Sequence, residues 1–99
     1  MTLQAPAHTD KYKLLKDIIP VLREGESKHG TGGVIVYNMT TTDIVYSLIT
    51  EFSSDFCDKL SDMLSDEPDS VFVIFEDNET RHIWRLPRVD ILNYVIGNT

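Results

Sequence analysis

The chain has 99 residues, which suits one domain and excludes two, because domains usually need roughly 100 to 200 residues each. With 41% hydrophobic and 25% charged residues its composition is that of a folded protein, so an intrinsically disordered chain is excluded. The formal net charge of -7 argues against direct binding to nucleic acid or to an anionic membrane, since both attract positive charge.

Features that would indicate secretion or membrane insertion are missing from the sequence. The longest apolar runs, 34–37 and 71–75, are far shorter than the roughly 18 to 20 residues that cross a bilayer. The only cysteine, Cys57, has no partner for an intramolecular disulfide, and the chain does not open with a signal sequence. We therefore expect a cytoplasmic protein with no membrane association.

The N-terminal part predicts a loose arm followed by a helix. Residues 1–8 carry no periodicity, so we expect a flexible arm there and one globular domain over 9–99. Thr9 or Asp10 can cap a helix whose apolar residues recur at three- and four-residue steps. Pro20 lies inside this helix, so it should kink there or stop and restart.

The stretch "KHGTGG", residues 28–33, holds three of the chain's five glycines. A phosphate-binding glycine loop follows a strand and opens a helix, so that backbone N–H groups converge on the anion. Here the glycines follow a helix and precede the apolar run "VIVY". The order predicts a joint, with Gly30 ending the helix, and not a phosphate site.

The middle of the chain predicts a strand and then one long helix. "VIVYN", residues 34–38, is apolar on both faces and indicates a strand that is covered on both sides. Thr40 and Asp43 resemble a capping box, and Pro68 closes the following segment. We therefore predict a helix from about 41 to 66.

The last third predicts a hairpin and a final helix. Residues 71–76 are nearly all apolar, "DNET" supplies turn formers, and 81–86 alternates between two faces. Pro87 suits the first turn of a helix that ends at Gly97. Its inward residues should be Val89, Ile91, Leu92, Val95 and Ile96. The predicted fold class is α+β, a single small domain with a three-stranded sheet packed by three helices in the order α-β-α-β-β-α.

Motifs for catalysis, metal binding or cofactor binding are missing. The three histidines, His8, His29 and His82, fall in separate elements without metal-ligand spacing, and Cys57 has no His or Cys near it in sequence. The chain contains no G-x-S-x-G elbow. We expect no enzyme, no cofactor and no metal.

Negative charge is concentrated in residues 51–79, which hold ten acids and the single base Lys59. At about 100° per residue, five of these acids fall within about 80° of one another on the predicted helix, opposite an apolar face. This predicted ridge consists of Glu51, Asp55, Asp58, Asp62 and Asp66. It is either a solvated face that keeps the protein soluble or a binding surface for a basic partner.

Three arginines, Arg81, Arg85 and Arg88, follow the acidic segment. They either pair within the molecule, with the acidic helix or the "EDNE" turn, or form a mixed-charge interface anchored by Trp84 or Tyr94.

The sequence thus favours a small acidic, non-enzymatic protein-binding module. It would be an inhibitor or antagonist of a basic nucleic-acid-handling protein, such as a nuclease, polymerase or DNA-binding protein, of the immunity, antitoxin or phage counter-defence type, and the ridge would act as a nucleic-acid mimic. The expected partner-binding residues are Glu51, Asp55, Asp58, Asp62, Asp66, Glu76, Asp77 and Trp84. The alternative is a self-associating structural or regulatory subunit, in which the long helix or an open sheet edge pairs with its own copy.

Overall fold

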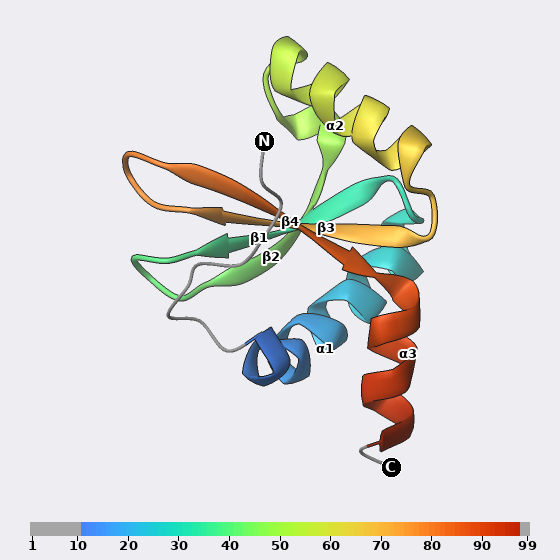
Figure 1. Ribbon diagram of the computed structural model, residues 1–99. Coiled ribbons are helices and arrows are strands. Elements are labelled where there is room, and N and C mark those ends of the chain that lie inside the picture. Colours follow the sequence, from blue (N-terminus) through green and yellow to red (C-terminus); the bar gives the residue numbers. More distant parts are fainter. Residues whose placement is uncertain (1–10, 98–99) are drawn as a thin grey trace.

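The computed structural model describes residues 11–97, and the fold is built on a mixed four-stranded sheet in the order β2-β1-β3-β4 (Figure 1). β1 and β3 run parallel, and the two outer strands pair antiparallel with their neighbours. The arm predicted over 1–8 and the capping residues Thr9 and Asp10 lie outside the described residues. The strands are β1 Gly33–Asn38, β2 Ile44–Leu48, β3 Ser70–Glu76 and β4 Arg81–Pro87.

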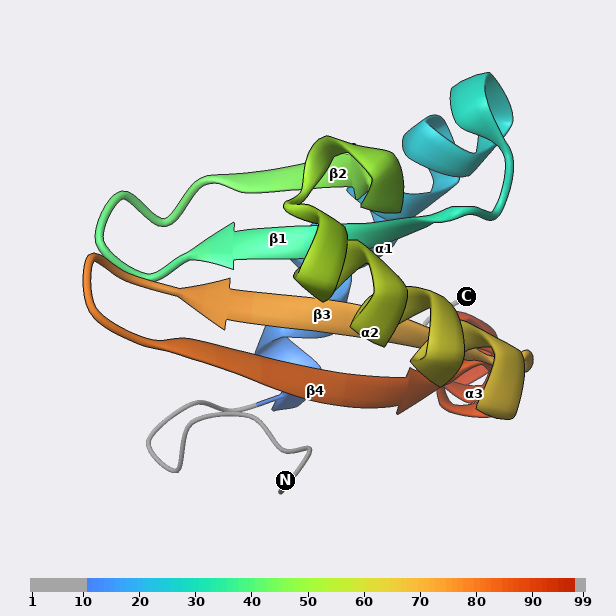
Figure 2. The same cartoon turned by 90° about the horizontal axis from the view of Figure 1, so that it is seen from above.

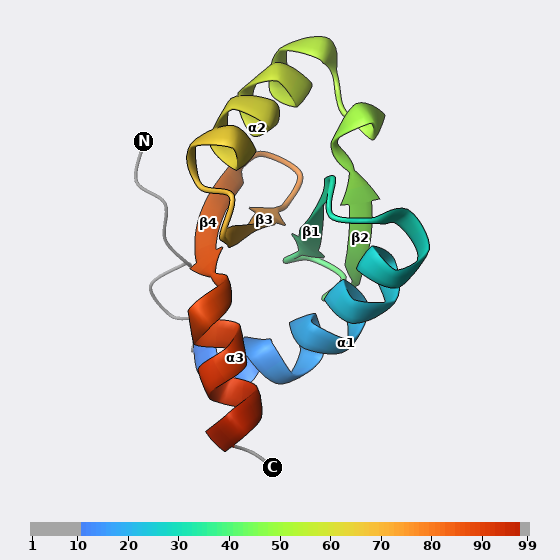
Figure 3. The same cartoon turned by 90° about the vertical axis from the view of Figure 1, so that its right-hand side faces the viewer.

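Three α-helices cover the two faces of this sheet. α1 and α3 lie on one face and α2 lies on the other, so the molecule has three layers, as Figures 1 and 3 show. A 3-10 turn, η1, connects β2 to α2. The bounds are α1 Lys11–His29, η1 Ile49–Glu51, α2 Ser54–Asp66 and α3 Arg88–Gly97. A small α+β fold with three helices is therefore confirmed, whereas the sheet has four strands instead of three.

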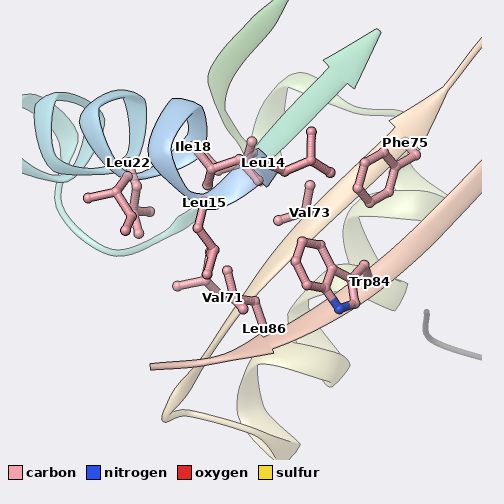
Figure 4. Packing of buried hydrophobic residues seen from close by; sticks show 11 residues of the cluster. Leu14, Leu15, Ile18, Leu22, Val71, Val73, Phe75, Trp84 and Leu86 are labelled. Carbon is pink, nitrogen blue, oxygen red and sulfur yellow. The ribbon is translucent and has the colours of Figure 1, made fainter. Parts of the chain in front are cut away.

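Each face of the sheet carries its own hydrophobic core. Inward residues of α1, among them Leu15 and Ile18, pack on alternate strand residues, as Figure 4 shows for Val73, Phe75 and Trp84. On the other face Leu60 of α2 is fully buried. It packs in a cluster with Val34, Val36, Phe72, Ile74 and Ile83. The central strands are thus apolar on both faces because both faces are covered.

The helix predicted from 41 to 66 is wrong in its first part, where the chain forms β2. Asn38 Oδ1 accepts hydrogen bonds from the backbone N–H groups of Thr40 and Thr41 at 2.8 and 3.0 Å. Thr42 follows with a φ of 63°. This Asn-centred turn reverses the chain, and the β-branched and aromatic residues of Ile44–Leu48 then pair with β1. The helix begins only at Ser54.

The glycine-rich stretch is a joint, as predicted. α1 ends at His29, and Gly30 takes the left-handed conformation with a φ of 80° while its N–H bonds to the Glu26 carbonyl at 2.9 Å. Pro20 does not divide the helix, because Lys11–His29 is one continuous α-helix.

α3 departs from its predicted orientation. Ile91 and Val95 pack against the core, but Val89, Leu92 and Ile96 are exposed. The helix therefore turns only part of its apolar surface inward.

Candidate functional site: an acidic helix face

The candidate site is the outer surface of α2, and the packing of the helix decides which residues form it. Leu60 is fully buried against the sheet, and Phe56 and Met63 pack partly buried beside it. The apolar side chains of this amphipathic helix thus face inward, which turns the acidic side to solvent. The acidic face of α2 consists of the exposed residues Asp55, Asp58, Asp62 and Asp66.

These four carboxylates form a continuous anionic strip. Their spacing of three and four residues puts them within an arc of about 80°, and at 1.5 Å per residue the strip is about 16 Å long. Within residues 11–97, none of the four forms an ion pair. Lys59 is the helix's only base. The acidic face therefore presents its charge outward, largely without local compensation.

Glu51 does not belong to this strip, which corrects the predicted ridge. It lies in η1, before the helix, and its Oε2 accepts a hydrogen bond from the Leu48 backbone N–H at 2.7 Å. Leu48 is the last residue of the edge strand β2. The carboxylate of Glu51 thus caps a backbone donor at the end of the sheet edge.

Glu76 and Asp77 support the hairpin between β3 and β4. Asp77 Oδ1 accepts hydrogen bonds from the N–H groups of Glu79 and Thr80, at 2.8 and 2.7 Å, and from Thr80 Oγ1 at 3.0 Å. These donors hold the pKa of the Asp77 carboxyl below its usual value. Glu76 forms an ion pair with Arg81 at 3.5 Å. Both carboxylates therefore have structural partners within the turn.

Arg81 and Arg85 point to the same side of the sheet as α2. The Arg81 guanidinium lies 4.3 Å from the ring centroid of Phe56 and 5.8 Å from that of Phe52. Arg85 lies 3.7 Å from the carboxylate of Glu67, directly after α2. Of the two alternatives that the sequence left open, the structure shows these arginines in intramolecular contacts. The aromatic contacts of Arg81 were not predicted, because they depend on how α2 lies across β4.

Arg88, the first residue of α3 directly after β4, links this end of the sheet to α1. Its guanidinium binds Glu26 with two hydrogen bonds, at 2.5 and 3.2 Å, although the two residues are 62 positions apart. The carboxylate raises the pKa of Arg88 above its usual value. The third arginine is therefore also held within the molecule.

Trp84 lies in the hydrophobic core and not on the surface. It is 6% exposed and its ring packs 5.9 Å from that of Phe75, beneath α1 (Figure 4). Trp84 is therefore buried and cannot anchor a partner at the surface, contrary to the prediction. The alternation along β4 indicated only that Trp84 lies on the same face as Leu86. This face is buried because α1 covers it.

Residues 11–97 contain no cluster of three His, Cys, Asp or Glu side chains arranged to hold a metal ion. In the same range, no helix has the length and apolar character that crossing a bilayer requires. No protein-family model matches the sequence, and neither a curated protein nor a solved structure shows significant similarity to it.

Proposed function

We propose that this protein is a non-enzymatic antagonist that binds a basic nucleic-acid-handling protein through the acidic face of α2. The partner would be a nuclease, a polymerase or a DNA-binding protein whose cationic groove normally holds a phosphate backbone. The single observation that carries the proposal is the row of exposed carboxylates at Asp55, Asp58, Asp62 and Asp66, none of which has an ion-pair partner among residues 11–97.

The spacing of the carboxylates suits this role. Neighbours at three and four residues on a helix are about 5 to 6 Å apart, which resembles the separation of backbone phosphates along a nucleic-acid strand. Because the backbone that carries the carboxylates is a packed helix, a partner has to order only their short side chains on binding. The strip thus offers a row of negative charges at helical spacing to a cationic groove.

The repulsion among the carboxylates of the strip destabilises the folded protein, which favours a functional explanation over simple solubility. Like charges at these spacings repel by some tenths of a kcal/mol per pair, and a helix that needs only solubility usually interleaves lysines. Arg81 and Arg85, which could have compensated the strip, are instead engaged on the sheet side of α2. The uncompensated charge would speed encounter with a basic partner by long-range attraction.

The test is affinity capture from the native host's lysate with three tagged forms of the full chain. They are the wild type, the triple variant Asp55→Asn, Asp58→Asn and Asp62→Asn, and a control variant with Asp17→Asn, Asp43→Asn and Asp90→Asn. All six positions are exposed, and both variants lose three negative charges. The control therefore separates the acidic face from the net charge.

We expect the wild type and the control to retain a basic partner at about 0.1 M salt and to release it at about 1 M, where the Debye length falls from roughly 10 to 3 Å. The α2 triple variant should lose the partner while keeping a wild-type circular dichroism spectrum. The purified partner should also lose its nucleic-acid binding when the wild type is added. Equal capture by the folded α2 variant, or a captured partner that still binds nucleic acid, would contradict the proposal.

A further inference from the structure

The start of α2, which carries half of the acidic face, is weakly secured by the helix itself. Ser53 occupies the N-cap position, but within residues 11–97 its side chain accepts no capping hydrogen bond. Leu60, which is fully buried, lies only at the middle of the helix. Asp55 and Asp58 therefore depend on another contact to hold their part of the helix against the sheet.

Arg81 makes this contact from β4, and Figure 2 shows α2 running obliquely across the sheet. Its guanidinium carbon lies 4.3 Å from the ring centroid of Phe56, in the first turn of α2, and 5.8 Å from that of Phe52, shortly before the helix. The two rings meet nearly edge to face, with 5.3 Å between their centroids. Because both guanidinium distances are within the roughly 6 Å of a cation–π contact, one side chain fastens the chain on both sides of the helix start.

The hairpin between β3 and β4 fixes the position of Arg81. Arg81 begins β4 and pairs across the hairpin with Glu76, whose carboxylate lies 3.5 Å from the Nε of Arg81. The turn between the two residues is held by the three hydrogen bonds that Asp77 Oδ1 accepts. The guanidinium therefore extends from a part of the sheet whose geometry does not depend on α2.

We infer that Arg81 is a positioning residue for the acidic face of α2. It keeps Asp55 and Asp58 in line with Asp62 and Asp66, which follow the buried centre of the helix. Without the contact only the second half of the strip, about 6 Å long, would stay fixed on the sheet. The consequence for binding rests on the proposed antagonist function, whereas the positioning itself concerns this chain alone.

The charge of Arg81 allows the inference to be tested by the sign of an effect. A guanidinium beside α2 also cancels part of the negative potential of the strip, so a purely electrostatic role predicts that its removal strengthens the binding of a polycation. A positioning role predicts weaker binding, because a partner must then order the backbone that carries two of the four carboxylates. The two roles thus change the affinity in opposite directions.

The first test is amide hydrogen exchange of the full chain, which needs no partner. Arg81→Ala should speed the exchange of the amides of residues 57–60 at least about threefold, because loss of the contact lets the first turns of α2 open more often. The amides of the central strands β1 and β3 should keep their wild-type protection. The control is Arg23→Ala, exposed on α1, which removes the same charge on the other face of the sheet and should leave α2 unchanged.

A double-mutant cycle tests the route through Phe56. Phe56→Leu removes the ring but keeps an apolar residue, so Arg81→Ala should change the exchange of residues 57–60 little in that background. Equal protection of α2 in Arg81→Ala and in the wild type would overturn the inference. Protection lost evenly over the whole chain would overturn it too, because Arg81 would then support the fold in general and not the acidic face.

The second test measures the binding of a fluorescently labelled hexalysine peptide by anisotropy at about 0.05 M salt. Six extended residues span about 20 Å and so cover the strip of about 16 Å. Arg81→Ala should raise the dissociation constant at least about twofold, and Arg23→Ala should lower it or leave it unchanged. Unchanged or tighter binding by Arg81→Ala would overturn the inference, since Arg81 would then do no more than compensate charge.

The outcomes separate this inference from the antagonist function. A wild type that captures no basic partner from lysate contradicts the antagonist function, while the exchange of the α2 amides still reports whether Arg81 positions the helix. A wild type that captures its partner, together with an Arg81→Ala variant that captures it equally well, contradicts the positioning role alone.

Discussion

Tyr46 shows how single residues fasten the end of α1 to the sheet edge. Its hydroxyl donates a hydrogen bond to the Gly30 carbonyl at 2.7 Å, and its ring stacks on His29 with 6.5 Å between centroids. Burial raises the pKa of the Tyr46 hydroxyl. Gly25 and Gly33 make room for the ring, since a Cβ on either would lie 2.2 or 2.5 Å from a Tyr46 ring atom. The two glycines are therefore packing positions.

Replacing Gly25 with Ala should destabilise the protein. The added methyl would meet three Tyr46 carbon atoms at 2.2 to 2.5 Å, so the overpacking should lower the free energy of unfolding by about 1 to 3 kcal/mol, outweighing the better helix propensity of Ala. Urea denaturation measures the change. Gly32→Ala is the control, because its added Cβ would have no atom within 4 Å.

A double-mutant cycle tests whether contact with the Tyr46 side chain causes the loss of stability in Gly25→Ala. Tyr46→Gly removes the whole side chain, including the Cβ that would lie 2.5 Å from the added methyl, so Gly25→Ala should cost little or nothing in that background. The same loss of stability with and without the Tyr46 side chain would show that the steric explanation is wrong.

At the scale of the element, α2 combines strong packing with unfavourable surface electrostatics. Leu60 is buried completely at its centre, while Asp62 stands four residues from both Asp58 and Asp66. The helix is thus held by its apolar side against repulsion along its outer side.

Asp62→Asn should stabilise the protein at low salt, because it removes two like-charge pairs at four-residue spacing and only one opposite-charge pair, with Lys59 at three-residue spacing. The expected gain in the free energy of unfolding is about 0.2 to 0.5 kcal/mol, since each pair contributes about that much and Asn and Asp have similar helix propensities. Thermal or urea denaturation at two salt concentrations measures it, and the gain should disappear at about 1 M salt. Asp43→Asn, exposed in the β1–β2 turn, is the control. A gain that persists undiminished at high salt would exclude charge repulsion as its origin.

At the scale of the whole molecule, the sheet separates two surfaces of opposite character. α2 with its acidic face covers one side, and the other side carries α1 and α3. α1, which contains five bases and three acids, is a basic element in an acidic protein. The chain is therefore strongly polarised across its layers.

Patterns of local sequence predicted much of the fold. The apolar periodicity of Lys11–His29 and the hairpin formed by β3 and β4 were found, and so was the joint at Gly30. The exposure of the four aspartates on α2 also followed from the helical period. These features depend on contacts between residues close in sequence, which local patterns report directly.

Only the tertiary structure decided that Ile44–Leu48 is a strand, that Trp84 is buried and that the apolar residues Val89, Leu92 and Ile96 of α3 are exposed. β2 exists because β1 lies beside it, and the pairing of backbone groups outweighs the helical spacing of its apolar residues. α1 crosses the sheet above Trp84 and covers it. α3 lies at the rim, where Ile91 and Val95 pack against the core and Val89, Leu92 and Ile96 remain exposed. The sequence by itself determined which residues could be buried together, and the non-local arrangement of the layers decided which of them were.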